Sequence, residues 1–427
     1  MKALLFHALL MLPVAAGAAV MAAPTGTHPG QTTANSLLPI KSKAELTHYL
    51  RDTPAGTSPL DKLSPWARRR FLAQLEFGQR GVTTINFGEP MAELTHPQIV
   101  QLFALFGAEQ EKLAQGLDIG LTPTEQSRIE REHIEDAKAR GCAPEDCPES
   151  EIERRYDELI LQEPPLSIPA AKRLALDRQR YGRLFADYQV PGRLSTTSKP
   201  DLRLLVRAVN EVLRSPSAMS GTYIAQLRMD LTEMQRRGMT EDKDYAQLYE
   251  LLLSARQFAE ATALLHQHPG LGESAMPTVR DSTANSSHGT PSALVVDTQG
   301  SLIRESVDLS REVQIVALSG DGCHFCDEAA QAIETDAQLR PLFTHRAIWL
   351  ASQGDDFAYA KTWNRLFPDQ PMHIAWQNSE WSMLGNDAWA ALPAFYVYQN
   401  GKLTKKFLGW DGIKKFKQSL REAGALH

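Results

Sequence analysis

Two cysteines separated by two residues give this chain its clearest chemical signal. Cys323 and Cys326 follow an apolar run, residues 313–318, and precede an apolar-periodic segment, residues 329–337. This order predicts a strand, a sharp turn and a helix, with the cysteines at the start of the helix. A pair in that position can close a small disulfide and open it again.

The predicted helix start assigns different roles to the two sulfur atoms. Free N–H groups and the positive end of the helix dipole favour a thiolate over a thiol. Because the thiolate is the species that attacks disulfides, Cys323 is the expected nucleophile. Cys326 lies one turn into the helix, where more of it is buried, and is the expected resolving thiol.

The two residues between the cysteines, His324 and Phe325, are the candidates for tuning the pair. As an imidazolium, His324 would stabilise the Cys323 thiolate and make the disulfide more oxidising. The alternative is a solvated turn residue with no such role. Asp327 and Glu328 oppose the thiolate by like-charge repulsion, so the sequence leaves reduction, oxidation and isomerisation open.

The rest of this segment alternates between strand-like and helix-like stretches. Leu392-Pro393 begins a strand rich in aromatic residues, and Asn400-Gly401 supplies a hairpin turn. The predicted elements are strands at 342–350, 392–398 and 402–410, helices at 355–367 and 413–423, and two strands within 293–308.

From about residue 293 to its end the chain resembles a thioredoxin-fold domain. The resemblance rests on C-H-F-C, on L-P-A-F-Y-V-Y-Q-N-G-K-L and on the closing helix. It implies that Pro393 is cis and lies against the redox pair, and that the backbone of Leu392 faces the substrate peptide. Gly322 stands where cytosolic thioredoxins carry Trp, and the strand before it has no acid. The turn is more similar to those of envelope isomerases and reductases.

The stretch 370–390 is longer than a minimal domain of this kind needs, and it contains Trp376, Trp381 and Trp389. We expect an insertion that covers the core; the alternative is an aromatic surface that faces the substrate.

Length and composition indicate a multidomain globular protein. The chain has 427 residues, a net charge of −6, 43% hydrophobic and 22% charged residues. A chain of this length is expected to contain two or three domains. No cluster of Arg and Lys interleaved with aromatic residues is present, so nucleic acid is not an expected partner.

The N-terminus predicts export. One basic residue, an apolar run and small residues indicate a signal peptide over residues 1–22. An uncleaved membrane anchor is the alternative, because the run approaches spanning length. The expected location is the periplasm or another exported compartment, and residues 23–40 read as a disordered lead.

The second cysteine pair, Cys142 and Cys147, lies in a short loop rich in proline and acidic residues. In an exported chain this pattern favours a structural disulfide that staples the loop between two helices. A second redox pair is the alternative. A metal site formed by all four cysteines and His324 would require two domains to meet, and a haem c site fails because Asp327 follows the second cysteine.

These patterns predict an α/β thioredoxin-like C-terminal domain preceded by a mostly α-helical N-terminal region. The predicted divisions are the helical region 41–267, which could form two subdomains, the flexible linker 268–291 and the thioredoxin-like domain 292–427. Leucine stripes in the helical region are expected to form core.

The expected function is that of an exported thiol-disulfide oxidoreductase that reduces, forms or isomerises disulfides in envelope proteins. Its expected partners are envelope proteins that contain cysteines, with a membrane electron donor or acceptor as a further candidate. The redox-active disulfide serves without a cofactor or metal, and the oligomeric state is open. The alternative is a helical envelope assembly or adaptor protein whose thioredoxin-like domain is mainly a binding module.

Overall fold

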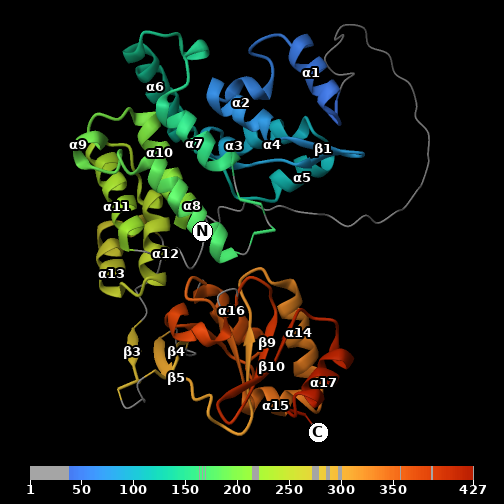
Figure 1. Ribbon diagram of the computed structural model, residues 1–427. Helices are drawn as coiled ribbons and strands as arrows, with labels where there is room; N and C mark the ends of the chain where they lie inside the picture. The colour runs from blue at the N-terminus through green and yellow to red at the C-terminus, as the bar shows by residue number, and fades with distance from the viewer. Residues whose placement is uncertain are drawn as a thin grey trace, which may run out of the picture. The chain divides into compact units, whose positions relative to one another are not determined.

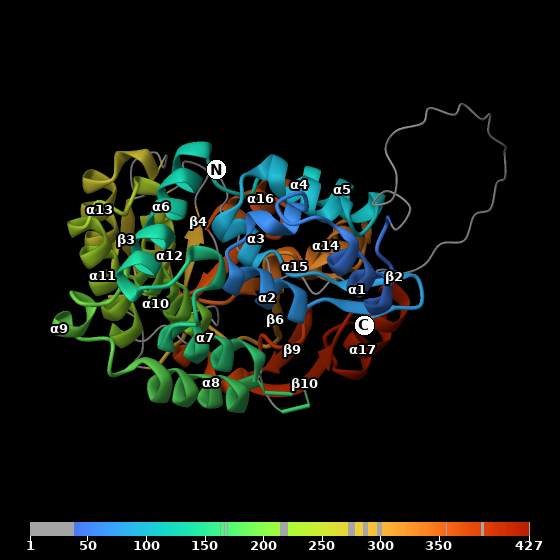
Figure 2. The ribbon, with the colours of Figure 1, turned by 90° about the horizontal axis from the view of Figure 1, so that it is seen from above.

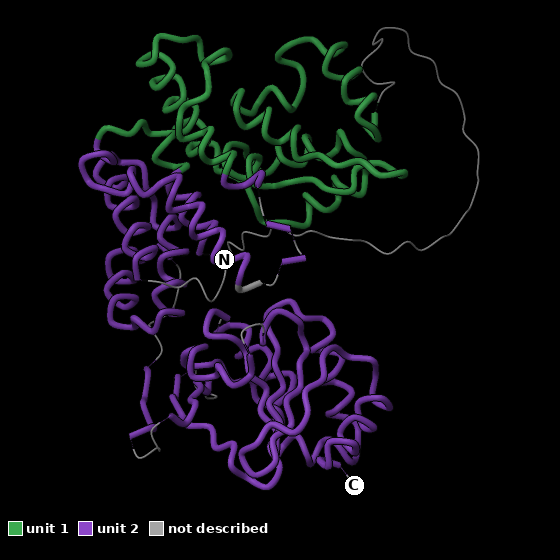
Figure 3. Tube along the Cα trace, in the orientation of Figure 1, with its two compact units in different colours: residues 1–158, 196–204 green, residues 159–195, 205–427 purple. Residues whose placement is uncertain are grey.

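The structure is a computed structural model that describes residues 38–162, 164–165, 167–168, 170–213, 221–271, 278–284, 289–296, 301–355, 357–385 and 388–426. The predicted signal peptide and residues 23–37 of the predicted lead lie outside this part of the chain. The chain divides into two compact units (Figure 3), the first formed by residues 1–158 and 196–204, the second by 159–195 and 205–427.

Unit 1 is mostly helical, and several of its helices begin at side chains that cap them. Ser42 and Ser64 accept hydrogen bonds from backbone N–H groups in the first turns of their helices. Thr122 and Glu125 form a reciprocal capping box at the start of the longest helix. The elements are α1 (Lys43–Asp52), η2 (Pro59–Lys62), α2 (Pro65–Ala73), β1 (Glu76–Gly78), β2 (Gly81–Thr84), α3 (Gly88–Glu93), α4 (His96–Ala104), α5 (Ala108–Gln115), α6 (Pro123–Arg140), η3 (Pro144–Asp146) and most of α7 (Glu151–Leu161).

Unit 2 begins with helices that lead to the sheet. In α11, the apolar stripe of Ile224, Leu227, Leu231 and Met234 is buried, which confirms the expectation that such stripes form core. Helices α11, α12 and α13 lie side by side in both views (Figures 1 and 2). The elements are α8 (Ala170–Phe185), α9 (Pro191–Leu194), α10 (Lys199–Leu213), which starts in unit 1, α11 (Gly221–Arg236), η5 (Asp242–Tyr245), α12 (Ala246–Ser254), α13 (Phe258–Gln267) and η6 (Pro269–Leu271).

The rest of unit 2 is organised around an eight-stranded sheet in the order β10-β9-β6-β7-β8-β4-β5-β3. The central strands β6, β7 and β8 are parallel, β9 runs antiparallel to β6, and β10 runs antiparallel to β9. The strands are β3 (Val279–Asp281), β4 (Ser292–Val296), β5 (Leu302–Ser306), β6 (Gln314–Leu318), β7 (Ala347–Ala351), β8 (Met372–Ala375), β9 (Ala394–Gln399) and β10 (Lys402–Leu408). The helices are α14 (His324–Thr335), α15 (Leu339–Arg346), α16 (Phe357–Leu366), η7 (Asn378–Leu384) and α17 (Ile413–Glu422).

The sheet is buried on both faces, and alternate residues of β6 belong to different clusters. Ile315 and Ala317 pack with residues of α14, α15, α16 and α17. Val316 and Leu318 pack on the other face with η7, including the fully buried Trp381. A strand covered on both faces explains why β6 reads as a continuous apolar run. This domain therefore has a thioredoxin-like α/β fold, and the region before it is mostly helical, as predicted.

Three segments can be compared with their predictions. The predicted strand 342–350 is wrong in its first half, because α15 continues to Arg346 and buries Phe343 before β7 begins. The predicted linker 268–291 contributes edge strand β3, which an ion pair between Asp281 and Arg304 joins to β5. The stretch 370–390 supplies β8 and η7 and covers the core with Trp381, as expected.

Among the described residues, no helix is both long and apolar enough to cross a membrane.

Candidate active site

The turn between β6 and α14 places the cysteine pair at one edge of the sheet. Ser319 follows β6 and is fully buried, and its hydroxyl group lies 2.7 Å from the Tyr359 hydroxyl of α16. Gly322 has φ +76°, a left-handed conformation that a residue with a Cβ adopts at a cost. This geometry accounts for a glycine directly before Cys323, which is the N-cap residue of α14.

The two cysteines form a disulfide but differ in exposure. Their Cα atoms are 5.3 Å apart. Cys326 is fully buried and belongs to the core cluster, whereas Cys323 is partly exposed. The Cys323 N–H donates to the Gly320 carbonyl at 3.2 Å, and the Cys323 carbonyl accepts from Cys326 N–H at 2.9 Å. Cys323 is therefore the more accessible residue of the pair, and the attacking and resolving roles remain predictions.

The two intervening residues point away from the core. Phe325 is 56% exposed. The side chain of His324 is 78% exposed, and its Nε2 lies 2.9 Å from a carboxylate oxygen of Glu328. Burial raises the pKa of Asp327, and the charge of Asp321 adds to this rise while His324 opposes it. The tuning roles of His324 and Phe325 remain predictions.

Leu392 lies beside this turn, and the expected contact of Pro393 with the cysteine pair remains a prediction. The Leu392–Pro393 peptide bond is cis, and Pro393 is buried. Ala394, the next residue, pairs with Leu318 at the end of β6. A methyl group placed on Gly320 would lie 3.0 Å from Cδ1 of Leu392, so the two segments are in close contact.

One acidic residue at the site, Asp355, was not predicted as a site residue. It comes from the loop after β7, and burial is the main cause that raises its carboxyl pKa. The carboxylate accepts hydrogen bonds from Ser352 and from the Asp321 N–H in the turn before Cys323. β6 and β7 are parallel neighbours, so their carboxyl ends meet at one edge. The signal available in the sequence was an acidic residue soon after the predicted strand 342–350, the next predicted strand along the chain after residues 313–318.

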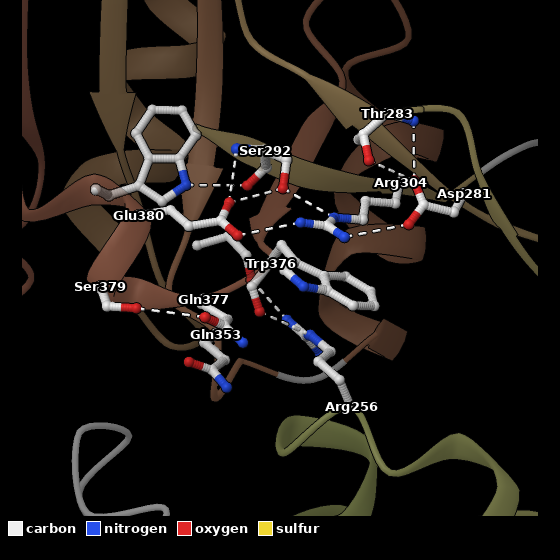
Figure 4. Close-up of polar contacts among 12 residues, drawn as sticks. Arg256, Asp281, Thr283, Ser292, Arg304, Gln353, Trp376, Gln377, Ser379 and Glu380 are labelled. Carbon is white, nitrogen blue, oxygen red and sulfur yellow. Dashed lines mark hydrogen bonds and ion pairs between the residues drawn. The ribbon is translucent and has the colours of Figure 1, made fainter. Parts of the chain in front are cut away.

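A second cluster of polar contacts lies at the end of β8, near the turn between α12 and α13 (Figure 4). Arg256 donates from Nε to the carbonyl of Trp376 at 3.0 Å and from a terminal nitrogen to that of Ala375 at 2.6 Å. On the same indole ring, the Arg304 guanidinium lies 4.3 Å from the centroid. Arg304 in turn is paired with Glu380. The α12–α13 hairpin and the sheet are therefore joined at the sheet edge that carries the turn with Cys323 and Cys326.

The other cysteines, Cys142 and Cys147, are also joined by a disulfide, with their Cα atoms 5.2 Å apart. The bond closes the loop between α6 and α7 in unit 1, around η3. Its structural role remains a prediction. Among the described residues, no group of three or more His, Cys, Asp or Glu side chains is arranged to hold a metal ion.

Comparison with solved structures gives distant matches. No protein-family model and no curated protein sequence matches the chain. Among solved structures, a thioredoxin candidate from Neisseria meningitidis shares 15% identity, with a TM-score of 0.22, over 33% of this chain and 91% of its own.

Two further solved structures are similar at the same level. StoA from Bacillus subtilis shares 10% identity over 29% of this chain and 92% of its own, with a TM-score of 0.21. A thioredoxin-like protein from Bacteroides caccae shares 11% identity over 59% of this chain and 93% of its own, with a TM-score of 0.21. The description of this fold as thioredoxin-like therefore rests on the strand order and on the position of the cysteine pair.

Proposed function

We propose that this chain is an exported thiol-disulfide oxidoreductase that uses Cys323 and Cys326 as its redox pair. One observation carries the proposal: a disulfide at the start of α14 whose first cysteine is partly exposed and whose second is fully buried. The neighbouring Leu392 supports it, because its side chain lies against Gly320 in the turn before Cys323, and the thioredoxin resemblance implies that the backbone of this residue meets the substrate peptide.

The exchange reaction balances without a cofactor. In the reducing direction, the Cys323 thiolate attacks one sulfur of a substrate disulfide, and the other substrate sulfur leaves as a thiolate that takes up a proton. The thiol of Cys326 loses its proton and attacks Cys323 in the mixed disulfide. The substrate leaves with two thiols, and the protein keeps a disulfide. Oxidation of a substrate is the same sequence in reverse. In isomerisation, a different substrate thiolate attacks the mixed disulfide, which forms a new substrate disulfide and releases Cys323 as a thiolate.

The proposed substrates are cysteine-containing proteins of the cell envelope, and a membrane electron donor or acceptor would reset the pair. The signal-like residues 1–22 support export, and the pairing of all four cysteines is consistent with an oxidising compartment.

The second candidate function is that of an envelope assembly or adaptor protein in which the thioredoxin-like domain mainly binds. The contact between Arg256 and the end of β8 favours it, because it fixes the α12–α13 hairpin at the sheet edge that carries the redox turn. The two functions are compatible, since a fixed helical hairpin can help to recognise a substrate.

Dithiol-driven reduction of a model disulfide protein separates the two candidates. The parent protein is expected to accelerate reduction, while Cys323→Ser and Cys326→Ser each lose at least 90% of the rate because no disulfide cycle remains. The matched control, Cys142→Ser with Cys147→Ser, should keep at least half of the rate. A parent protein that fails both to reduce and to oxidise model substrates would contradict the oxidoreductase and favour the adaptor.

A further inference from the structure

The loop from Ser352 to Asp355 contacts both the redox turn and the helical hairpin. On one side, Asp355 accepts a hydrogen bond from the Asp321 N–H at 3.2 Å. On the other, the Gln353 side-chain amide donates to the carbonyl of Ser254, the last residue of α12, at 2.9 Å. The loop is therefore held at both sides and can fix the turn that presents Cys323.

Asp355 is well placed to hold that turn. The Oδ1 atom of Asp355 lies close to Gly320, since a Cβ atom added to this glycine would be 3.5 Å from it. The carbonyl of Gly320 in turn accepts a hydrogen bond from the Cys323 N–H. The other oxygen of Asp355 accepts from the Ser352 N–H at 2.7 Å and from the Ser352 hydroxyl at 2.6 Å. Both carboxylate oxygens are thus occupied, one by its own loop and one by the redox turn.

The groups that face this carboxyl are mainly acidic. Asp321 lies in the turn and raises the pKa of Asp355, as burial does to a greater degree. Tyr359 of α16 feels the charges of Asp327, Asp355 and Asp321, which together with burial raise its pKa. The imidazole of His324 lies in this turn, with its Nε2 2.9 Å from a carboxylate oxygen of Glu328. A negative charge on Asp355 therefore has hydrogen-bond donors but no ion-pair partner among the described residues, and it acts against a thiolate at the same turn.

We propose that Asp355 is a positioning residue for the exchange reaction, one that fixes the turn presenting Cys323 and makes the Cys323 thiol less acidic through its charge. The inference rests on the proposed function. The acid that it names, Asp355, follows β7, whereas the helix that carries the cysteine pair follows β6. Asp355→Asn keeps an oxygen that can accept from the Asp321 N–H but removes the charge, whereas Asp355→Ala removes both.

The test measures the acidity of Cys323 and the exchange rate separately. In the reduced protein, iodoacetamide alkylation of the Cys323 peptide is followed by mass spectrometry from pH 5 to 9. The disulfide is then equilibrated with glutathione. A control, Asp308→Asn, removes an exposed carboxylate that precedes β6 and so lies at the other end of that strand from the redox turn.

For Asp355→Asn we expect alkylation at pH 6 to be at least threefold faster than in the parent. We also expect the equilibrium constant for forming the disulfide with glutathione to fall at least threefold, because a more stable thiolate favours the reduced state. Asp355→Ala should lose at least fivefold in exchange rate, while Asp355→Asn keeps at least half of it. The control should match the parent in all three measurements.

Ser352→Ala gives an independent reading if the Asp355 variants do not fold. Losing a hydroxyl donor to the carboxylate should raise the Asp355 pKa and so accelerate alkylation near pH 6, in the same direction as Asp355→Asn. The proposal is overturned if Asp355→Asn, or in its absence Ser352→Ala, alkylates with the pH profile of the parent, or if Asp355→Ala exchanges as fast as the parent. Alkylation needs no substrate, so a parent without exchange activity would count against the proposed function alone.

Discussion

At the scale of single residues, the position of His324 differs from that expected of a residue whose only role is to stabilise the Cys323 thiolate. Its imidazole lies against Glu328, and both side chains are largely exposed. Surface ion pairs of this kind contribute little to stability, and salt screens them. Any charge that His324 carries is therefore partly neutralised by Glu328 before it acts on the thiolate. The redox turn has a mixed electrostatic environment in which acids outnumber the one histidine.

Asp230 is a buried acidic residue of unit 2 that lies in α11, away from the cysteine pair. It is fully buried and accepts a hydrogen bond from the Gln189 side chain at 3.0 Å. Its second oxygen has no hydrogen-bond partner among the described residues. Burial raises its pKa to about 7. The folded protein therefore binds a proton at Asp230 across a range where the unfolded chain has already lost it.

This raised pKa predicts that Asp230 makes unit 2 less stable as the pH rises. Because the folded pKa lies above the unfolded one, the stabilisation is complete below about pH 4 and is lost as the pH rises to about 7. Asp230→Asn has no such proton, so between pH 4 and pH 8 it should gain about 2–4 kcal/mol relative to the parent. Hydrogen exchange of the α11 amides measures this difference.

Asp242 provides the matched control. Its pKa is lowered, chiefly by the hydrogen bond from the Gly270 N–H, so Asp242→Asn should change the pH dependence only at acidic pH, below the range in which Asp230 titrates. If parent and Asp230→Asn show parallel pH dependence from pH 4 to pH 8, Asp230 is ionised in the folded protein and the prediction fails.

The place of the cysteine pair at a helix start could be predicted from the sequence because its signal is local. Cys323, Cys326 and Pro393 each stand next to a strand or helix boundary that apolar periodicity reveals. Asp355 could not be predicted in the same way. It lies 34 residues from Asp321 along the chain, and only the parallel pairing of β6 and β7 brings the two together.

At the scale of elements, Arg256 joins the α12–α13 turn to the sheet. It has φ +62°, which directs the chain through a left-handed turn after α12. Its guanidinium donates to the carbonyls of Ala375, Trp376 and Leu253 and lies 5.7 Å from the centroid of the Trp376 ring. Burial lowers its pKa to about 9, so it stays protonated at neutral pH. The cation binds main-chain oxygens at the end of β8 rather than a carboxylate.

We predict that Arg256→Met loosens the hairpin from the sheet. Two strand-end carbonyls lose a charged donor, and a hydrogen bond to a charged group contributes about 1.5–3 kcal/mol net of exchange with water. The net loss of stability should be about 1–3 kcal/mol, and the amides of α13 should exchange hydrogen at least tenfold faster.

Arg228→Met is the control for this change. Arg228 pairs with Glu260 between α11 and α13, and both side chains are 47% exposed, so its loss should cost less than about 1 kcal/mol. Equal exchange rates in Arg256→Met and Arg228→Met would show that Arg256 does not hold the hairpin.

Element boundaries show where tertiary contacts override local pattern. The residues before β7 read as strand because apolar and β-branched types alternate there, but the core side of α15 buries Leu339 and Phe343. β3 was hidden in a polar stretch because it is an edge strand of three residues. Arg304, on the neighbouring strand, binds Asp281, and a pairing of this kind between segments leaves no periodic signal in the sequence.

At the scale of the whole molecule, each compact unit contains one disulfide. The bond between Cys142 and Cys147 closes a short loop in unit 1, and the bond between Cys323 and Cys326 begins the redox helix in unit 2. Composition and the change from helical to alternating patterns predicted a helical region followed by an α/β domain. The helices from residue 205 onward belong to the same compact unit as the sheet, whereas the predicted linker 268–291 placed them in a separate region.

The central claim is that Cys323 attacks and Cys326 resolves, and trapping of mixed disulfides tests it most directly. Each single serine variant is exported in cells, thiols are blocked with acid and alkylating agent, and the adducts are mapped by mass spectrometry. Cys326→Ser should accumulate mixed disulfides joined through Cys323, because nothing resolves them, while Cys323→Ser should accumulate few or none. Adducts that accumulate on Cys326 in Cys323→Ser, with none on Cys323 in Cys326→Ser, would contradict the account.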